Sequence, residues 1–198
     1  MRPKDLVPPK VVYLASTNIH KYLEAREVVA GEGLSLAFLR EDVPELQGED
    51  VAEIAAQGAV WAAEKWDLPI LVEDTGLFIE ALGGFPGPYA SYVLKTIGLD
   101  GILKLMDGVA NRRAYFKTAL AFCDGKGSEP VVFTGEAHGW IGQEARGSGG
   151  FGYDPIFLPE GGGGRTFAEM DVAEKNALSH RAKAFKAFCD WYKAYRGL

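Results

Sequence analysis

Short apolar runs alternate with amphipathic segments in the N-terminal part of the chain, and this alternation restricts the fold more than any other feature. Residues 11–16 and 34–39 are apolar runs that each predict a buried strand. A helix is expected after the first run, and residues 50–66 carry a second helical stripe of apolar side chains. Residues 70–74 predict a third strand. Strands and helices in this order form a β-α-β unit and predict an α/β fold.

The middle of the chain predicts strands of a different kind. Residues 112–124 and 129–142 are long apolar and aromatic stretches separated by a Gly-Lys-Gly turn, which favours an antiparallel hairpin. A short helix is expected over residues 99–106, a strand over residues 156–159 and a C-terminal helix from Ser179 onward. Together with the β-α-β unit, the hairpin predicts a mixed β-sheet flanked by helices.

Composition limits the class of protein. The chain has 198 residues, 47% of them apolar, which suits a single domain over residues 1–198 or two lobes that share one core. The net charge of -6 and the absence of any long basic run argue against a nucleic-acid partner. Cys123 and Cys189 are isolated, so neither a zinc cage nor a disulfide framework is expected, and the chain is predicted to be cytoplasmic. No apolar run is long enough for a membrane span, and the charged start "MRPKDLVPPK" does not resemble an export signal.

Two adjacent acids, Glu73 and Asp74, follow the third predicted strand and are expected to mark its end. Neighbouring carboxylates repel each other unless a cation or solvent reaches both. Residues 41–53 hold six acids and no base, and Glu45 or Glu49 from this segment could join the pair to bind Mg²⁺. A solvated acidic rim is the alternative interpretation.

The segment "ASTNIHK", residues 15–21, leads from a strand through a polar turn into a helix. Free backbone N–H groups at a helix start, together with Lys21 one turn later, can hold a phosphate. The alternative is an ordinary cap by Thr17 or Asn18 with a solvated lysine. The segment lacks the pattern of a Walker loop.

The segment "GSGGFGYDP", residues 147–155, contains more glycine than a simple turn requires. Close approach of the backbone to a ligand would explain this composition, and a flexible loop is the alternative. Phe151 and Tyr153 offer an aromatic face on which a base could stack, and Asp154 offers an acceptor for the polar edge of the base.

The segment "EKNALSHRAKAF", residues 174–185, begins the C-terminal helix. Lys175, His180 and Arg181 could donate hydrogen bonds to phosphate oxygens or to a keto group. The alternative is a capping Ser179 beside solvated cations. Each motif is weak alone, but carboxylates, a helix start, lysines and an aromatic face are together the parts of a nucleotide site.

Four segments also carry a resemblance to a known family. In chain order, "ASTNIHKYLE", "LVEDTGLFIEALGGFPGPY", "GGFGYDPIF" and "AEKNALSHRAKA" resemble the inosine triphosphate pyrophosphatase family across nearly the whole chain. The resemblance implies a homodimeric α/β protein with a long central mixed sheet and an active cleft between two lobes. It also implies Mg²⁺-dependent hydrolysis of ITP, dITP or XTP to the nucleoside monophosphate and pyrophosphate.

The resemblance assigns roles to individual residues. Asp74 would accept a proton from the attacking water, and Glu45 with Asp74, helped by Glu73, would hold Mg²⁺; Glu49 aligns almost as well as Glu45. A donor from Arg181, His180 or the nearby backbone at the 6-position of the purine would favour a keto group over an amino group. The predicted substrate-binding residues are Ser16, Thr17, Asn18, Lys21, Thr75, Phe151, Gly152, Tyr153, Asp154, Lys175, His180 and Arg181.

Two positions depart from the pattern of the family. Thr17 stands where many members have glycine, and Gln57 stands where some members have a lysine. The first change would keep the backbone farther from phosphate, and the second would leave one phosphate contact missing or replaced.

Two other functions stay open on the sequence. One is a pyrophosphatase of the septum-inhibitor (Maf) type that acts on modified nucleotides, against which the SHR and FGYD segments argue. The other is a non-catalytic nucleotide- or RNA-binding module whose binding would not depend on Mg²⁺. The net charge of -6 counts against RNA.

Overall fold

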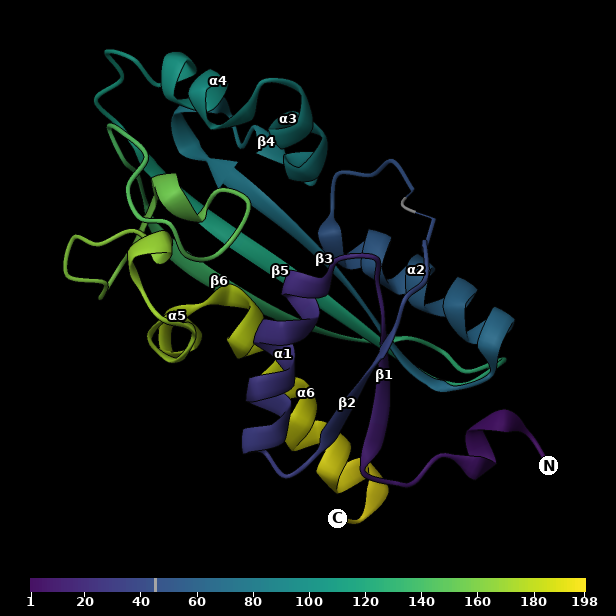
Figure 1. The fold of residues 1–198 in the computed structure, drawn as a ribbon. Helices are drawn as coiled ribbons and strands as arrows, with labels where there is room; N and C mark the ends of the chain where they lie inside the picture. Colours follow the sequence, from purple (N-terminus) through teal and green to yellow (C-terminus); the bar gives the residue numbers. More distant parts are fainter. Residues whose placement is uncertain (45) are drawn as a thin grey trace. The chain divides into compact units, whose positions relative to one another are not determined.

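The β-α-β unit predicted for the first part of the chain is present in the computed structural model, which describes residues 1–44 and 46–198 (Figure 1). Its elements are β1 (Val11–Ala15), α1 (Ile19–Gly31), β2 (Ser35–Leu39), α2 (Val51–Trp66) and β3 (Pro69–Ile79). Both long helices begin at side-chain caps. Asn18 Oδ1 accepts hydrogen bonds from two backbone N–H groups of α1, and the Asp50 side chain accepts one from Ala52 in α2.

The strands form one mixed sheet, as predicted. Its order is β2-β1-β3-β5-β6-β7, and β4 pairs with β3. β1 runs parallel to β2 and β3, whereas β4 is antiparallel to β3 and β7 is antiparallel to β6. The remaining strands are β4 (Pro86–Gly87), β5 (Arg113–Asp124), β6 (Val131–Ile141) and β7 (Phe157–Pro159). Residues 125–130 are too few for a parallel crossover, so β5 and β6 form the expected hairpin.

The described part of the chain contains four further helices: α3 (Ala90–Thr96), α4 (Gly98–Leu105), α5 (Val172–Leu178) and α6 (His180–Arg196). The sequence predicts α4 and α6 but not α3 or α5. Ser179 separates α5 from α6, because its ψ of 148° is extended. Short 3₁₀ turns occur at Pro3–Leu6, Glu80–Leu82, Asp154–Ile156 and Phe167–Glu169. Within the described residues, no helix is both long and apolar enough to cross a membrane.

Contacts divide the chain into two compact units. Unit 1 contains Met1–Asp74, Thr118–Gly135 and Arg181–Leu198. Unit 2 contains Thr75–Lys117 and Glu136–His180. β3, β5 and β6 contribute residues to both units. The single domain predicted over residues 1–198, and the cleft implied between two lobes, stay predictions.

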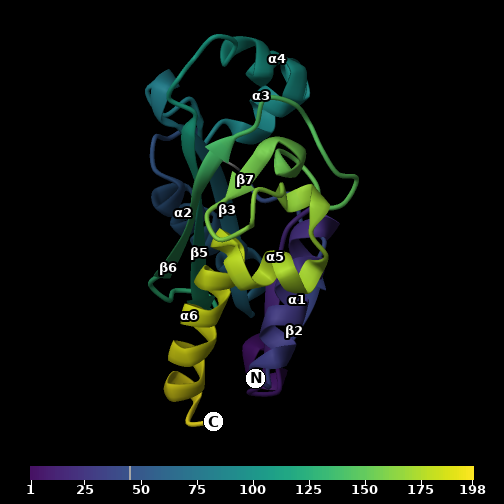
Figure 2. The same cartoon turned by 90° about the vertical axis from the view of Figure 1, so that its left-hand side faces the viewer.

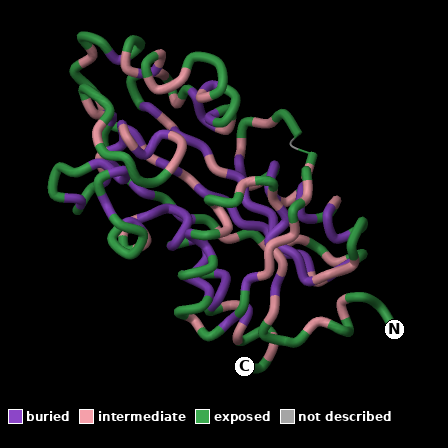
Figure 3. The backbone as a smooth tube through the Cα atoms, in the orientation of Figure 1, coloured by how far each residue is buried: buried purple, intermediate pink, exposed green. Residues whose placement is uncertain are grey.

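In unit 1, β3 and β5 are buried on both faces, and helices cover them. α1 and α6 lie beside each other in both views of the ribbon (Figures 1 and 2), and their apolar residues form one cluster with Leu71, Leu120 and Phe122 of the strands. α2 covers the opposite face through a second cluster with Ile70, Val72, Ala119 and Ala121. Figure 3 shows the resulting line of buried residues along the strands. Side chains alternate between these two clusters along β3 and β5, as a strand requires.

Unit 2 has its own apolar core. Leu77 and Ile79 of β3, and Ala114 and Phe116 of β5, form a cluster with residues of α3 and α4. The Phe116 ring packs edge-on against Phe157, with the ring centroids 4.7 Å apart.

β3 is longer than the sequence predicts. The expectation that the strand stops at Glu73 and Asp74 is wrong, because β3 continues to Ile79 and pairs with β4 through Leu77 and Gly87. The approach of β4 requires glycine at position 76, where a Cβ atom would lie 2.8 Å from the Gly87 carbonyl oxygen. Both acids therefore lie inside a regular strand.

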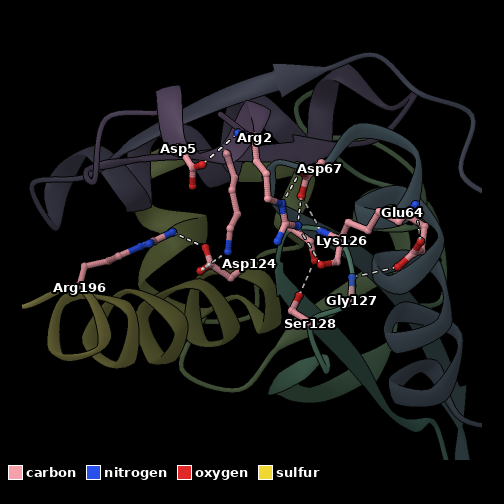
Figure 4. Close-up of polar contacts among 11 residues, drawn as sticks. Arg2, Asp5, Glu64, Asp67, Asp124, Lys126, Gly127, Ser128 and Arg196 are labelled. Carbon is pink, nitrogen blue, oxygen red and sulfur yellow. Dashed lines mark hydrogen bonds and ion pairs between the residues drawn. The ribbon is translucent and has the colours of Figure 1, made fainter.

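An ionic cluster in unit 1 fixes the N-terminal segment (Figure 4). The Arg2 guanidinium binds both carboxylate oxygens of Asp67, with Nε 2.8 Å from Oδ2, and the Lys126 backbone N–H donates to Asp67 Oδ1 at 2.8 Å. Asp124 accepts hydrogen bonds from Tyr195 and Arg196 near the end of α6. The cluster joins the N-terminus, the end of α2 and the β5-β6 turn.

We expect Asp67→Asn to remove an acid-sensitive part of the stability. The hydrogen bond from Arg2 lowers the pKa of Asp67 from 3.8 to about 2. Because the folded pKa lies below the unfolded value, the ionised carboxylate stabilises the fold above roughly pH 4, and this contribution is lost as the pH falls toward 2. Asparagine also tolerates the left-handed backbone at this position, where φ is 50°.

The test compares the melting temperatures of wild type and Asp67→Asn between pH 2 and pH 6. The wild type should melt higher at pH 6, and the difference should shrink toward pH 2. A difference that does not vary with pH would contradict the assignment.

Candidate active site

Glu73 and Asp74 are neighbours in sequence but point to opposite faces of the sheet. Leu71 lies in the cluster with α1 and α6, whereas Ile70 and Val72 lie in the cluster with α2. Because side chains alternate along a strand, Glu73 shares the face of Leu71, and Asp74 shares the face of Val72. The two carboxylates are therefore separated by the sheet, and their repulsion is small.

Glu73 belongs to a buried ionic network within unit 1. Arg181 binds it with two hydrogen bonds, Nε to Oε2 at 2.9 Å and Nη2 to Oε1 at 3.1 Å. Arg181 Nη1 also donates to Glu24 Oε2 at 2.6 Å. Lys21 Nζ lies 3.5 Å from Glu73 Oε1 and donates to the Glu73 carbonyl oxygen at 3.2 Å. Two cations and two carboxylates thus lie together where α1, β3 and α6 pack against one another.

The Arg181-Glu24-Glu73 part of the network is almost inaccessible to water. Arg181 is 2% exposed, and Glu24 and Glu73 are 6% and 8% exposed. Burial alone would lower the pKa of Arg181, but the carboxylates of Glu73 and Glu24 raise it above its usual value. Arg181 therefore acts as a fixed internal cation. The predicted role of Arg181 beside a base stays a prediction.

Glu24 is a member of the network that was not among the predicted site residues. It lies on α1 four residues before Val28, and both are buried. A charged residue on the apolar stripe of a helix is a signal for a buried ion pair, and this signal was available in the sequence.

Asp74 lies on the α2 face of the sheet, where the acidic segment also packs. A Cβ atom at Gly58 of α2 would lie 3.0 Å from a methyl carbon of Val43 and 3.0 Å from a methyl carbon of Val72. The acidic segment therefore contacts the same side of β3 to which Val72 and Asp74 belong. Glu45 lies outside the described residues.

The described residues contain no group of three or more His, Cys, Asp or Glu side chains able to hold a metal ion. Mg²⁺ commonly takes only one or two carboxylates and fills its other positions with water and substrate phosphate. Asp74, 8% exposed, provides oxygen ligands of the required kind, and Glu49 is an exposed acid of the segment that packs on this face. Glu73 lies on the other face, and both of its carboxylate oxygens accept hydrogen bonds from Arg181.

In the turn before α1, side-chain oxygens accept hydrogen bonds from nearby backbone N–H groups. Ser16 Oγ accepts the Asn18 N–H at 3.1 Å, and Asn18 Oδ1 accepts the N–H groups of His20 at 3.0 Å and Lys21 at 3.3 Å. Asn18 is thus the cap, and Thr17 is exposed. Lys21 extends from this turn to Glu73.

Unit 2 brings together three predicted nucleoside-binding residues. Lys175 Nζ binds Asp154 Oδ2 at 2.5 Å, and both side chains are 4% exposed. The same oxygen of Asp154 accepts the Phe151 N–H at 2.8 Å. The Lys175 ammonium lies 4.9 Å from the centre of the Phe151 ring and 5.5 Å from that of Phe167. A cation, an acceptor and a half-buried aromatic ring therefore form one cluster.

The glycines of this loop have a structural explanation. Gly150 and Gly152 both have a φ of 66°. A Cβ atom at Gly150 would lie 2.1 Å from Asp154 Oδ2, whereas one at Gly152 would meet nothing within 4 Å. Gly150 is required by the approach of the Asp154 carboxylate.

Tyr153 does not have the exposed ring that was predicted. Its side chain is 4% exposed, lies in the core of unit 2 and donates its hydroxyl hydrogen to the Ala90 carbonyl oxygen at 2.8 Å. Burial raises the pKa of Tyr153 to about 12. The ring is held in the core, and the stacking face expected of Phe151 stays a prediction.

His180 and Arg181 are consecutive residues that belong to different units. The His180 ring is 2% exposed and stacks on Phe116, with centroids 4.5 Å apart and an interplanar angle of 15°. Thr75 is the first residue of unit 2 and is half-buried. The structure thus arranges the predicted residues in two groups, one in each unit.

These features define a mixed α/β protein. Its polar motifs lie on strands and helices, and they supply the buried ionic groups. Comparison with known proteins gives the family: the chain belongs to the Ham1 family, whose sequence profile matches residues 12–191.

Several relatives match almost the whole chain. A protein of Methanopyrus kandleri named dITP/XTP pyrophosphatase is 52% identical over 92% of this chain and 96% of its own length. One of the same name from Thermococcus kodakarensis is 49% identical over 90% and 95%. The solved structure of a HAM1 protein from Coxiella burnetii has a TM-score of 0.80 at 31% identity, covering 93% of this chain and 98% of its own. The resemblance drawn from the sequence, and the predicted fold class, are confirmed.

Arg181→Met should destabilise unit 1 strongly, because it leaves two buried carboxylates without their main cation. We expect a loss of about 3–5 kcal/mol in the free energy of unfolding, measured by urea denaturation. Lys193→Met is the control, since it breaks a half-buried pair with Glu32 at 2.8 Å, in which water still reaches both charges, and should cost only about 0–1 kcal/mol. Equal losses of unfolding free energy in the two variants would show that the buried network contributes no more to stability than the Lys193-Glu32 pair.

Gly150→Ala should disturb the Asp154-Lys175 pair, whereas Gly152→Ala should not. Both substitutions put a side chain at the same positive φ, costing about 1–2 kcal/mol of backbone strain. Only Gly150→Ala adds a clash with Asp154, so its thermal unfolding midpoint should be clearly lower. Similar midpoints for the two variants would contradict this role of Gly150.

Proposed function

We propose that this protein hydrolyses the non-standard purine nucleoside triphosphates ITP, dITP and XTP to the nucleoside monophosphate and pyrophosphate. One observation carries the proposal: relatives named dITP/XTP pyrophosphatase match nine tenths or more of the chain at about half identity. Removal of such nucleotides keeps them out of nucleic-acid synthesis, so the activity is a form of house-cleaning in nucleotide metabolism.

Asp74 is the proposed general base. The reaction needs a carboxylate that accepts a proton from water as the water attacks the α-phosphorus and pyrophosphate leaves. Asp74 fits this role because its side chain lies on the face of the sheet opposite the Arg181 network. A salt bridge to Arg181 would weaken a base, and that interaction is made by Glu73 instead.

Mg²⁺ is the proposed cofactor, held by Asp74 together with Glu45 or Glu49 of the acidic segment. The ion would neutralise negative charge on the phosphate oxygens. We assign Glu73 a different role from the one implied by the resemblance. Because its carboxylate binds Arg181 and approaches Lys21, Glu73 positions these cations and does not ligate the metal.

The triphosphate is assigned to unit 1. The turn formed by Ser16, Thr17 and Asn18 leads into the N-terminus of α1, which favours anions. Lys21 adds a positive charge in the first turn of the helix. Thr75, next to Asp74, is proposed as a further contact to the substrate.

The nucleoside is assigned to residues of unit 2. Phe151 offers a half-buried ring for the base, and Gly152 lets the loop turn beside it. Lys175 and Asp154 offer a donor and an acceptor held against that ring. Tyr153 supports the loop from the core through its hydrogen bond to Ala90.

Discrimination against ATP requires a donor at the purine 6-position. We assign this donor to His180 rather than to Arg181, whose Nε, Nη1 and Nη2 atoms already bind carboxylates. A keto group accepts such a hydrogen bond, whereas an amino group would leave the donor unsatisfied at a cost of about 1–3 kcal/mol.

The working form of the enzyme is proposed to be a cytoplasmic homodimer that uses a small-molecule nucleotide and needs neither nucleic acid nor a membrane. The acidic composition and the isolated buried cysteines, Cys123 and Cys189, support this environment.

The decisive assay measures pyrophosphate release from ITP, XTP, dITP, ATP and GTP in parallel, with and without Mg²⁺. Metal-dependent turnover of ITP, dITP and XTP far above that of ATP and GTP is expected. No turnover of any nucleotide by folded protein would refute the proposed reaction.

Asp74→Asn should lower kcat for ITP by about 10²–10⁴-fold, because the amide cannot accept the proton from water. Asp190→Asn, on the exposed surface of α6, is the matched control and should keep wild-type kcat. Circular dichroism would check that both variants are folded. A folded, fully active Asp74→Asn enzyme would remove Asp74 from the role of base.

A further inference from the structure

A cluster of buried phenylalanine rings lies in the core of unit 2. It consists of Phe116 of β5, Phe157 of β7 and Phe167 of the 3₁₀ turn Phe167–Glu169. The Phe157 and Phe167 rings are stacked, with centroids 5.4 Å apart at 27°, and Phe116 lies 6.4 Å from Phe167 at 34°. Because Phe116 also packs against Phe157, each ring contacts the other two, and none turns independently. We call these three residues the phenylalanine cluster.

The phenylalanine cluster contacts two polar side chains that are assigned to the nucleoside. The His180 ring stacks on Phe116 at 4.5 Å and also lies 6.4 Å from Phe167, tilted by 47°. The Lys175 ammonium lies 5.5 Å from the centre of the Phe167 ring. Stacking fixes the plane of an imidazole, and the negative face of a ring attracts a cation. Phe167 therefore holds both side chains at once.

Hydrogen bonds fix the 3₁₀ turn of this cluster to the loop in front of it. The Thr166 N–H donates to Glu169 Oε2 at 2.7 Å, and the Thr166 hydroxyl donates to the Arg146 carbonyl oxygen at 2.9 Å. The Gly149 N–H donates to the Ala168 carbonyl oxygen at 2.9 Å. The turn and the glycine-rich loop are thus fixed to each other, and the cluster is supported by a rigid backbone.

Rigidity of a hydrogen-bond donor determines how well it rejects the wrong base. A donor held in one direction is left unsatisfied when an amino group faces it, and that loss disfavours adenine. A mobile donor turns away from the amino group at little cost, so the discrimination is lost. The contacts that hold His180 in place therefore bear directly on the preference for a keto group.

We propose that Phe116 and Phe167 are positioning residues for nucleotide selection. Both rings hold His180 in the direction that favours a 6-keto purine, and Phe167 also holds Lys175 beside the base. The inference rests on the proposed function, in which His180 and Lys175 contact the nucleoside. Neither phenylalanine contacts the substrate in this assignment, because both act through the polar side chains.

The test measures kcat/KM for ITP and for ATP in Phe116→Leu and Phe167→Leu. The ratio of the two values should fall by about 2–30-fold in each variant. Phe167→Leu should also raise KM for ITP more than it lowers kcat, because Lys175 binds the nucleoside and takes no part in the bond exchange. Phe122→Leu is the matched control, since it removes a buried ring from unit 1. It should lower the melting temperature and keep the wild-type ratio.

Replacement of Phe167 by pentafluorophenylalanine separates electrostatics from packing. The fluorinated ring keeps nearly the same shape, but its face is positive and repels the Lys175 ammonium. We expect KM for ITP to rise by about 2–30-fold while the melting temperature stays close to that of the wild type. A wild-type KM in this protein would show that Phe167 does not hold Lys175 through its ring face.

Two measurements need no turnover. Calorimetry gives the affinities for IMP and AMP, and their ratio should fall in Phe116→Leu and Phe167→Leu as the kinetic ratio does. Nuclear magnetic resonance gives the shifts of the carbon-bound protons of the His180 ring, which are assigned by their absence in His180→Gln. The Phe116 ring should move these signals upfield, and Phe116→Leu should remove that displacement.

Folded Phe116→Leu and Phe167→Leu enzymes that keep the wild-type ratio of ITP to ATP would overturn the proposal. An equal fall of the ratio in Phe122→Leu would also overturn it, because any loss of core packing would then have the same effect. A wild type that turns over none of the nucleotides would refute the proposed hydrolysis instead. The affinity ratios for IMP and AMP in the same variants would then decide for or against the phenylalanine cluster.

Discussion

The salt bridge between Arg181 and Glu73 is the constraint on which the structure of unit 1 depends. It joins the first turn of α6 to the middle of β3, and Glu24 adds α1 to the same cation. Three elements from distant parts of the sequence therefore meet at one guanidinium. A buried ion pair is destabilising unless every charge has a partner. These elements must therefore pack so that the charged groups lie within hydrogen-bonding distance of one another.

The same salt bridge explains how a strand can carry two consecutive acids. Alternation sends Glu73 toward the cations of α1 and α6 and leaves Asp74 on the side of α2. One carboxylate binds Arg181 inside the fold, and the other lies on the opposite face, where it is the proposed general base. The division of roles follows from the pleat of the strand and needs no special backbone geometry.

Local patterns predicted the elements of the fold well. β1, β2, β7 and the β5-β6 hairpin depend on neighbours in sequence, so periodicity and turn residues were sufficient to find them, whereas β4 was not predicted. Predictions failed where a side chain interacts with a residue far away in the sequence. Arg181, which allows Glu73 to lie inside β3, is 108 residues away, and Ala90, which binds the Tyr153 hydroxyl, is 63 residues away. The motifs located the candidate site, but the direction of each side chain required the tertiary structure.

The junction between α5 and α6 also limits how the sequence can change in length. Ser179 ends one helix, His180 packs on Phe116 of unit 2, and the next residue, Arg181, enters the ionic network of unit 1. Insertion or deletion of one residue here would turn the following helix by about 100° relative to the preceding contacts. Natural variants of this segment are therefore expected to differ by substitution and not by length.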